Sequence, residues 1–145
     1  MKNRMILLVS VCALSLTACA GNAQIVAYNN LPQQAQTFVT THFSQSDIAF
    51  ILSERDGLHN EYEVRLNDGT KLEFDYQGNL EKIDCQTRPV PAGIVPAPIV
   101  EYVNTKHTGM FIVEYSIDRR KQSVELNTEV EIEFDRAGNF LRYDW

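Results

Sequence analysis

Hydrophobic and polar side chains alternate along two segments that share one turn sequence. The first is residues 71–84, KLEFDYQGNLEKID, and the second is residues 131–144, EIEFDRAGNFLRYD. A period of two is typical of a strand with one buried face. The shared Glu-Phe-Asp-x-x-Gly-Asn motif places an aspartate that can accept backbone N–H bonds near a glycine that tolerates positive φ. Each segment therefore predicts a β-hairpin.

Helical periodicity precedes each set of strands. Residues 31–43 carry apolar side chains at helical spacing after Pro32, which suits a first helical position, and residues 98–107 repeat this arrangement. The remaining alternating segments predict strands at residues 48–55, 61–66, 110–119, 122–127, 129–136 and 139–145. Residues 86–94 are rich in proline and interrupt both patterns, so they predict a semi-rigid connector.

The order of these elements predicts an α+β fold, a tandem repeat of a helix followed by a four-stranded antiparallel sheet. The first unit would occupy residues 31–85 and the second residues 95–145, on either side of the connector. A unit of about 60 residues buries too little surface to be comfortably stable alone. We therefore expect the two sheets to join edge to edge or to pack tightly, with both helices on one face.

The first residues are typical of an export signal rather than of the fold. Lys2 and Arg4 precede an apolar run too short to span a bilayer, which predicts a signal peptide over residues 1–19 and a tether over residues 20–30. Cys19 ends the sequence LTAC, which resembles a bacterial lipobox and implies a periplasmic or outer-membrane lipoprotein. Ordinary cleavage after the sequence ACA would instead give a soluble periplasmic protein.

Lipidation of Cys19 gives a direct test. A Cys19→Ser variant should lose acyl labelling and membrane retention while its far-UV circular dichroism stays that of the wild type, because Cys19 lies outside both predicted units. Soluble mature wild-type protein with Gly21 as its first residue would contradict the lipoprotein prediction.

Charge and composition narrow the range of partners. Hydrophobic residues make up 44% of the chain, a share too high for a disordered protein. Without Lys2 and Arg4 the mature chain carries 11 basic and 19 acidic residues, a net charge of −8. Binding to phosphate needs a basic face, so nucleic acid is not an expected partner, and membrane contact is expected only through the lipid. The oligomeric state stays open.

Few residues suggest chemistry. His42, His59 and His107 lack the spacing of a zinc site, and no metal or other cofactor is expected. His42 and His107 end the two predicted helices, where a cation meets the negative end of the helix dipole. The sequence contains no serine-nucleophile, phosphate-loop or dinucleotide motif, so no enzyme activity is predicted. Cys85 is interpreted as a small half-buried hydrophobe or as one half of an intermolecular disulfide.

Protein binding through the open face of the sheets, opposite the helices, is the favoured function. The last strand would present tyrosine and tryptophan there, two residue types that often carry binding energy. The candidate partner-binding residues are Tyr143, Trp145, Glu131, Glu133 and Arg65, and the other acids expected on this face are Glu61, Glu63, Glu73 and Glu129. The opposite assignment, with Tyr143 and Trp145 in the core, stays open. Two alternative functions also stay open: a structural or accessory lipoprotein without a specific partner, and a small-ligand binder or enzyme.

The strands and turns resemble a known family. Residues 62–66, 68–75 and 78–79, and again 131–134 and 138–139, are similar to the pattern of the PepSY-like, beta-lactamase-inhibitor-like secreted proteins of Bacteroidetes-type bacteria. The resemblance implies export and a fold similar to that of the beta-lactamase inhibitor protein, whose concave sheet holds a partner enzyme. It implies no catalytic residues.

Overall fold

The computed structural model describes residues 23–144. Two α-helices lie in this range, α1 (Gln33–His42) and α2 (Ala97–Lys106), and short 3-10 helices at Tyr28–Asn30 and Gln45–Asp47 flank α1. The strands are β1 (Gln24–Ile25), β2 (Ile48–Asp56), β3 (His59–Leu66), β4 (Lys71–Phe74), β5 (Leu80–Asp84), β6 (Ile112–Ile117), β7 (Lys121–Leu126), β8 (Glu131–Asp135) and β9 (Phe140–Asp144). The predicted signal peptide, Cys19 and Trp145 lie outside the described residues.

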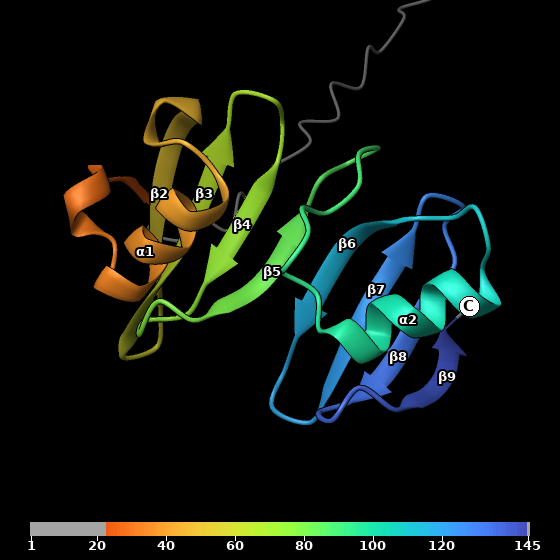
Figure 1. Cartoon of the computed structure of the whole chain (residues 1–145). Coiled ribbons are helices and arrows are strands. Elements are labelled where there is room, and N and C mark those ends of the chain that lie inside the picture. Colours follow the sequence, from red (N-terminus) through yellow and green to blue (C-terminus); the bar gives the residue numbers. More distant parts are fainter. Residues whose placement is uncertain (1–22, 145) are drawn as a thin grey trace, which may run out of the picture.

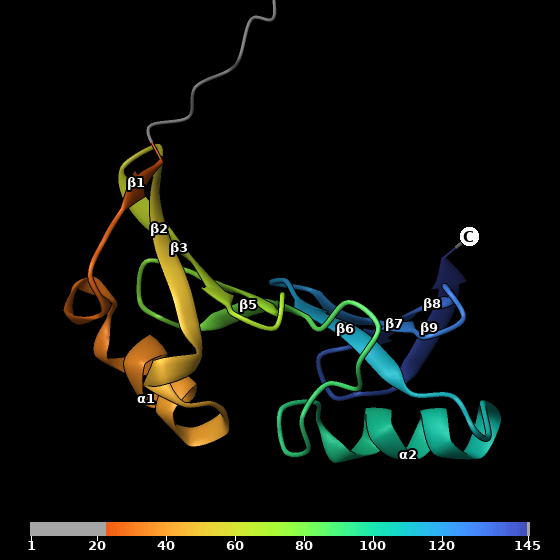
Figure 2. The same ribbon diagram turned by 90° about the horizontal axis from the view of Figure 1, so that it is seen from above.

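The nine strands of this range form one antiparallel sheet, and their order across the sheet is their order along the chain. Figure 1 shows the continuous sheet, and Figure 2 shows both helices on the same side of it. The predicted fold class is therefore wrong: the structure is a single, mostly β sheet with two helices, not a tandem repeat of a helix plus a four-stranded sheet. The fold similar to that of the beta-lactamase inhibitor protein, which the resemblance implies, was part of this prediction and is corrected with it.

The pairing of β5 with β6 explains this difference. Ile83 lies opposite Tyr115, and the backbone N–H of Cys85 donates to the carbonyl of Val113 at 2.9 Å. These bonds use two strand edges that separate sheets would leave exposed, and exposed edges invite unwanted pairing with other chains. β1, in the segment predicted as a tether, extends the sheet further by pairing with β2.

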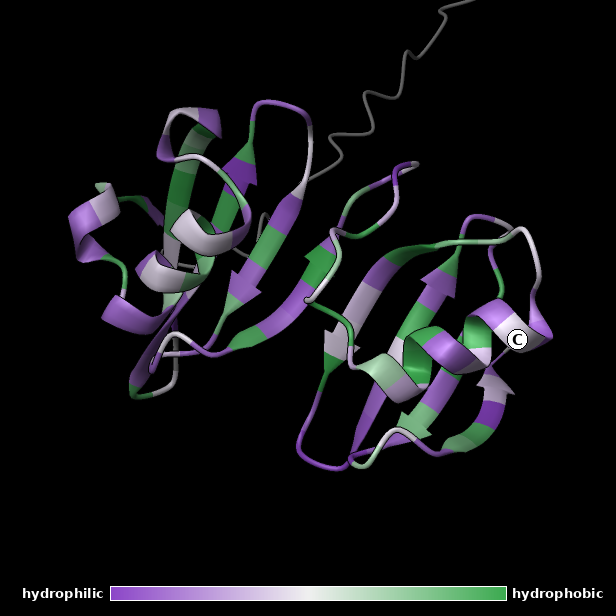
Figure 3. Cartoon of the chain, viewed as in Figure 1, coloured by the Kyte–Doolittle hydropathy of each residue, from purple (hydrophilic) through white to green (hydrophobic). Residues whose placement is uncertain are grey.

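A single row of apolar side chains crosses the helix-facing side of the sheet from β2 to β8. Its members lie directly opposite one another and are each at most 2% exposed: Ile51, Val64, Leu72, Ile83, Tyr115, Val124 and Ile132. Val39 of α1 and Val103 of α2 pack into the same cluster. Figure 3 shows the hydrophobic and hydrophilic residues that alternate along these strands. One core thus runs through the β5–β6 seam.

The turns after β4 and β8 have the geometry that their shared motif predicts. Asp75 and Asp135 each accept hydrogen bonds from the backbone N–H groups two and four residues later, at 2.8–2.9 Å. Gly78 and Gly138 adopt φ angles of 90° and 88°. The first turn also lies against α1, where a Cβ on Gly78 would come within 2.8 Å of the backbone nitrogen of Ala35.

A β-bulge interrupts each of the hairpins that contain these turns. Glu133 pairs with Arg142, but the next residue, Phe134, pairs with Phe140, so Leu141 is an extra residue in β9. Glu81 holds the equivalent position in β5. An extra residue shifts the alternation of side chains by one position. The bulge therefore decides which side chains of the last strand face the helices.

The connector is fixed to the first half of the sheet. Arg88 donates to the carboxylate of Asp68 at 2.5 Å and to its backbone carbonyl at 2.9 Å. Cys85, which directly precedes this segment, is 3% exposed and is therefore buried more deeply than the half-buried position that the sequence predicts. None of the helices within residues 23–144 combines the length and the apolar character needed to cross a membrane.

Candidate functional site

The open face of the sheet carries a row of carboxylates across β5 to β9. Its members lie directly opposite one another, and we call them the acidic row: Asp84, Glu114, Glu125, Glu131 and Asp144. Like charges directly opposite each other in a sheet are destabilising. The fold therefore tolerates an unfavourable electrostatic interaction at this position.

Lys82 relieves part of this repulsion. Its Nζ atom lies 2.7 Å from Oε1 of Glu114, and no other cation in the described part of the chain lies within 4 Å of the row. Burial raises the pKa of Glu125, repulsion from Glu114 and Glu131 raises it further, and Lys82 acts in the opposite direction. Most of the row therefore keeps an uncompensated negative charge.

Two basic residues continue the same line into β3 and β4. Lys71 lies opposite the first member of the acidic row, and Arg65 lies opposite Lys71. Each is paired along its own strand, Arg65 Nε with Glu63 Oε1 at 2.6 Å and Lys71 Nζ with Glu73 Oε1 at 2.6 Å. The predicted site residues Arg65 and Glu131 thus share one cross-strand line, but the basic residues are already neutralised.

Glu133 and Glu129, which are also predicted on the open face, do not belong to the acidic row. Glu133 is 3% exposed because Arg142 and Lys121 cover it, with Arg142 Nε 2.7 Å from its Oε2. Hydrogen bonds from Arg142 and from Lys121 hold the pKa of Glu133 below its ordinary value. This carboxylate is already paired with two cations, and its role in partner binding stays a prediction. Glu129 lies in the turn before β8 with a φ of 64°, so its placement on a strand is wrong.

Of the two orientations left open for Tyr143, the structure has the one that faces the helices, because the bulge at Leu141 shifts the alternation. Tyr143 lies opposite Ile132 of the core row. Its hydroxyl lies 3.3 Å from that of Tyr102 and 3.2 Å from Nε2 of His107, both at α2. A partner-binding role for Tyr143 and Trp145 stays a prediction that the structure does not test.

The histidines occupy separate places. His42 is the last residue of α1 and packs against Phe38 with ring centroids 4.7 Å apart, while His107 follows the end of α2. His59 stacks on Tyr76 at 4.1 Å with an interplanar angle of 19°. Within residues 23–144 no group of three or more His, Cys, Asp or Glu side chains could hold a metal ion.

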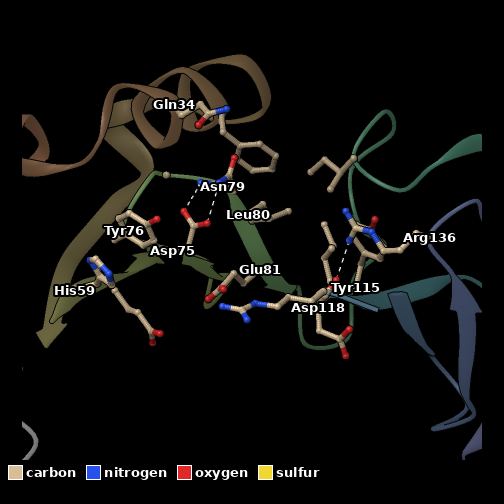
Figure 4. A pocket seen from close by; sticks show the side chains of 16 residues that line it. Gln34, His59, Asp75, Tyr76, Asn79, Leu80, Glu81, Tyr115, Asp118 and Arg136 are labelled. Carbon is tan, nitrogen blue, oxygen red and sulfur yellow. Dashed lines mark hydrogen bonds between the residues drawn. The ribbon is translucent and has the colours of Figure 1, made fainter. Parts of the chain in front are cut away.

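A groove of about 850 Å³ lies between α1 and the turn that joins β6 to β7 (Figure 4). Apolar and charged side chains both line it: Phe38, Leu80, Ile94 and Ile117, with Glu61, Glu81, Arg119 and Arg136. Sequence reasoning misses this groove because the residues come from distant segments. The basic turn sequence DRRK at residues 118–121 is the one local signal.

A family model described as "putative beta-lactamase-inhibitor-like, PepSY-like" matches residues 60–142. This range runs from β3 to β9 and includes both bulged hairpins. A search of curated proteins finds no match.

Solved structures from Bacteroides are similar over nearly their whole length. One is a "putative calcium-regulated periplasmic protein" of Bacteroides thetaiotaomicron, with 35% identity, a TM-score of 0.81, and coverage of 86% of this chain and 98% of that one. A "putative periplasmic protein" of the DUF2874 family from Bacteroides vulgatus has 33% identity, a TM-score of 0.81, and coverage of 87% and 99%. A third, also from Bacteroides vulgatus and of unknown function, has 31% identity, a TM-score of 0.80, and coverage of 85% and 99%.

Proposed function

Because the chain belongs to the PepSY-like, beta-lactamase-inhibitor-like family, we propose that it is an exported, non-enzymatic protein that binds a partner protein through the open face of its sheet. The acidic row is the observation that carries this proposal. Its five carboxylates lie next to one another on a solvent-facing surface with one lysine in contact. A partner with a complementary basic surface would relieve their mutual repulsion.

The charges of the acidic row would affect the rate of association and the orientation of the partner more than the affinity. Complementary charges across an interface mainly raise the association rate and fix the orientation of the partner. Phe50 extends the same line beyond Arg65 and is 41% exposed, which offers an apolar contact at its far end. We therefore propose that the partner presents lysine or arginine side chains to the second half of the sheet and an apolar group to β2.

The periplasmic description of the similar Bacteroides proteins supports export of this chain. In that setting the mature protein would meet envelope proteins rather than cytoplasmic ones. Attachment through a lipid on Cys19 would hold the protein at the membrane, and the acyl-labelling experiment with Cys19→Ser tests this part separately.

Neutralising the acidic row should weaken partner capture from the native envelope. With Glu125→Gln and Glu131→Gln combined, we expect a captured basic protein to be depleted about tenfold at low ionic strength, since two favourable charge interactions are lost. A variant with Asp47→Asn and Glu101→Gln changes the net charge equally, at positions in the 3-10 helix before β2 and in α2, away from the strands of the open face. That control should retain the partner, and equal capture by all three proteins would refute the proposal.

A structural or accessory role without a specific partner is the second candidate. The predominance of charged side chains on the open face favours it, because interface centres are usually depleted of charged residues. The same capture experiment separates the two roles. A specific partner is recovered in a fixed ratio and is lost with the row variant, whereas an accessory protein yields only weak capture that both charge variants reduce alike.

The capture experiment should also test the effect of Ca²⁺, although no calcium site is assigned to this protein. A similar Bacteroides protein is described as putatively calcium-regulated, and carboxylate oxygens are the ligands that Ca²⁺ prefers. Capture should therefore be measured with and without Ca²⁺. Because no group of side chains in residues 23–144 could hold a metal ion, Ca²⁺ should weaken capture only by screening charge, to the same extent as an equal ionic strength of another salt.

A further inference from the structure

The hairpin of β2 and β3 extends beyond the strand that follows it. Pairing of β3 with β4 ends where Tyr62 lies opposite Phe74, whereas β2 and β3 stay paired up to their turn. We call the extension, residues 54–61, the hairpin tip. Every residue of the tip whose burial is described is exposed. Figure 2 shows β1 and the tip at the end of the hairpin away from α1. The tip therefore contributes no side chain to the core.

The two most exposed large apolar side chains in the described part of the chain lie at this end of the sheet. Leu58, in the turn of the tip, is 85% exposed, and Ile25 of β1 is 77% exposed. The next highest value is 51%, for Leu141 at the other edge of the sheet. Apolar surface gains free energy when it leaves water. The concentration of such surface here points to an apolar environment at this end of the molecule.

β1 directs the preceding chain toward the tip. It runs antiparallel to β2, with Gln24 opposite Ser53 and Ile25 opposite Leu52. A step from Ile25 back to Gln24 therefore leads toward the turn that contains Leu58. Leu58 follows Ser53 by five positions, the last two of them in the turn, so the tip ends roughly 10–15 Å beyond Gln24.

Cys19, the predicted lipidation site, lies close to this end of the sheet along the chain. Five positions separate it from Gln24. Five residues span at most about 17 Å, which is scarcely more than the distance from Gln24 to the end of the tip. A chain that continues in the direction of β1 therefore brings a lipid on Cys19 and the end of the tip to nearly the same depth.

We propose that the hairpin tip lies against the membrane, with Leu58 at the boundary between headgroups and acyl chains and Ile25 near the headgroups. This contact rests on the lipidation of Cys19 proposed above. A single leucine would hold a free protein at a bilayer only weakly. The lipid makes the contact intramolecular, and an attachment only five positions from β1 gives it a high effective concentration.

The charge of the protein is compatible with this contact. The net negative charge of the mature chain argues against attraction to anionic lipid, and Glu54 and Glu61 add negative charge to the tip. The contact made by Leu58 is apolar, so it does not depend on attraction between charges. Vesicles of zwitterionic phosphatidylcholine are therefore the appropriate probe, because they do not repel the two glutamates.

Fluorescent labels locate the tip in the lipidated protein. An NBD dye is attached to Leu58→Cys, Ile25→Cys or Arg120→Cys in phosphatidylcholine vesicles that contain a nitroxide lipid. Cys85 is 3% exposed and should not react in the folded protein. Arg120 is the matched control, since it is exposed at the end of the β6–β7 hairpin. Quenching should be about threefold stronger at position 58 than at position 120, and intermediate at position 25.

A measurement without labels excludes insertion driven by the dye. On vesicles, backbone amides of residues 56–60 in the lipidated wild type should exchange about threefold more slowly than in soluble Cys19→Ser protein. Leu58→Asp should abolish this slowing, because a carboxylate is costly to place among acyl chains. Leu141→Asp makes the same change at an exposed leucine of β9 and should keep the slowing. Circular dichroism should show that both variants stay folded.

The outcomes separate this contact from the lipid anchor. With Cys19 shown to be acylated, equal quenching at positions 58 and 120, or slowed exchange that persists in Leu58→Asp, would overturn the contact alone. A shift of NBD emission at position 58 that grows with protein concentration in the absence of vesicles would assign this end to a second copy of the chain instead. Wild-type protein without acyl labelling would refute the anchor and the contact together.

Discussion

Replacing Phe74 or Phe134 by alanine should lower the free energy of unfolding by about 3–5 kcal/mol. Both rings are 0% exposed. Phe74 packs edge-on against Phe38 of α1 at 5.6 Å, and Phe134 packs edge-on against Tyr102 of α2 at 5.4 Å. Each substitution would therefore leave a cavity between the sheet and a helix. Urea titration followed by far-UV circular dichroism measures the loss.

Both variants should unfold in a single transition. The buried cluster includes residues from β2 to β8 and from both helices, so damage at one end weakens the whole core. Phe140→Ala serves as the control, because that ring is 39% exposed and should cost about 1–2 kcal/mol. Two separate transitions, or a second half that stays folded when the first has unfolded, would contradict the single-core description.

Gly78→Ala should cost about 2–5 kcal/mol, although it adds only one methyl group. The φ of 90° is unfavourable for alanine, and the new Cβ would lie 2.8 Å from the backbone nitrogen of Ala35 and 2.9 Å from Cβ of Pro32. The turn and α1 would have to separate. Thermal and urea unfolding of the variant measure this cost.

Gly109→Ala is the matched control for this steric effect. Gly109 has a similar φ of 82°, but nothing lies within 4 Å of an added Cβ. It should therefore lose only the backbone contribution, about 1–2 kcal/mol. Equal losses for the two variants would show that contact between the turn and α1 contributes nothing.

Sequence reasoning succeeds where the interactions are local. The alternation and the Asp-x-x-Gly-Asn motif predict both hairpins because the bonds that make the turns join residues at most four positions apart. The union of the hairpins into one sheet is different. β5 and β6 are separated by the connector and α2, and no local pattern specifies that Ile83 lies opposite Tyr115. The small size of each unit therefore predicts edge-to-edge joining only as one of two alternatives, and it does not specify which residues pair.

The candidate site shows the same contrast. Alternation predicts that Glu131 faces outward, but a bulge of one residue reverses the assignment of Tyr143. The acidic row becomes visible only when the register aligns residues from five strands. The groove depends on the ends of several elements, so its charges have no common spacing in the sequence. Local sequence patterns therefore do not predict sites whose residues come together only through strand register or through the ends of distant elements.

The strand order has a consequence for how such a protein is made. From β2 onward, each described strand pairs with the strand that precedes it in the chain. A chain delivered across a membrane with its amino end first can therefore extend the sheet one strand at a time, without waiting for a later segment. Pairing between neighbours also keeps contacts local, which favours fast folding for a β protein. Two steps must close a long loop: β1–β2, with α1 in the loop, and β5–β6, with α2 in the loop.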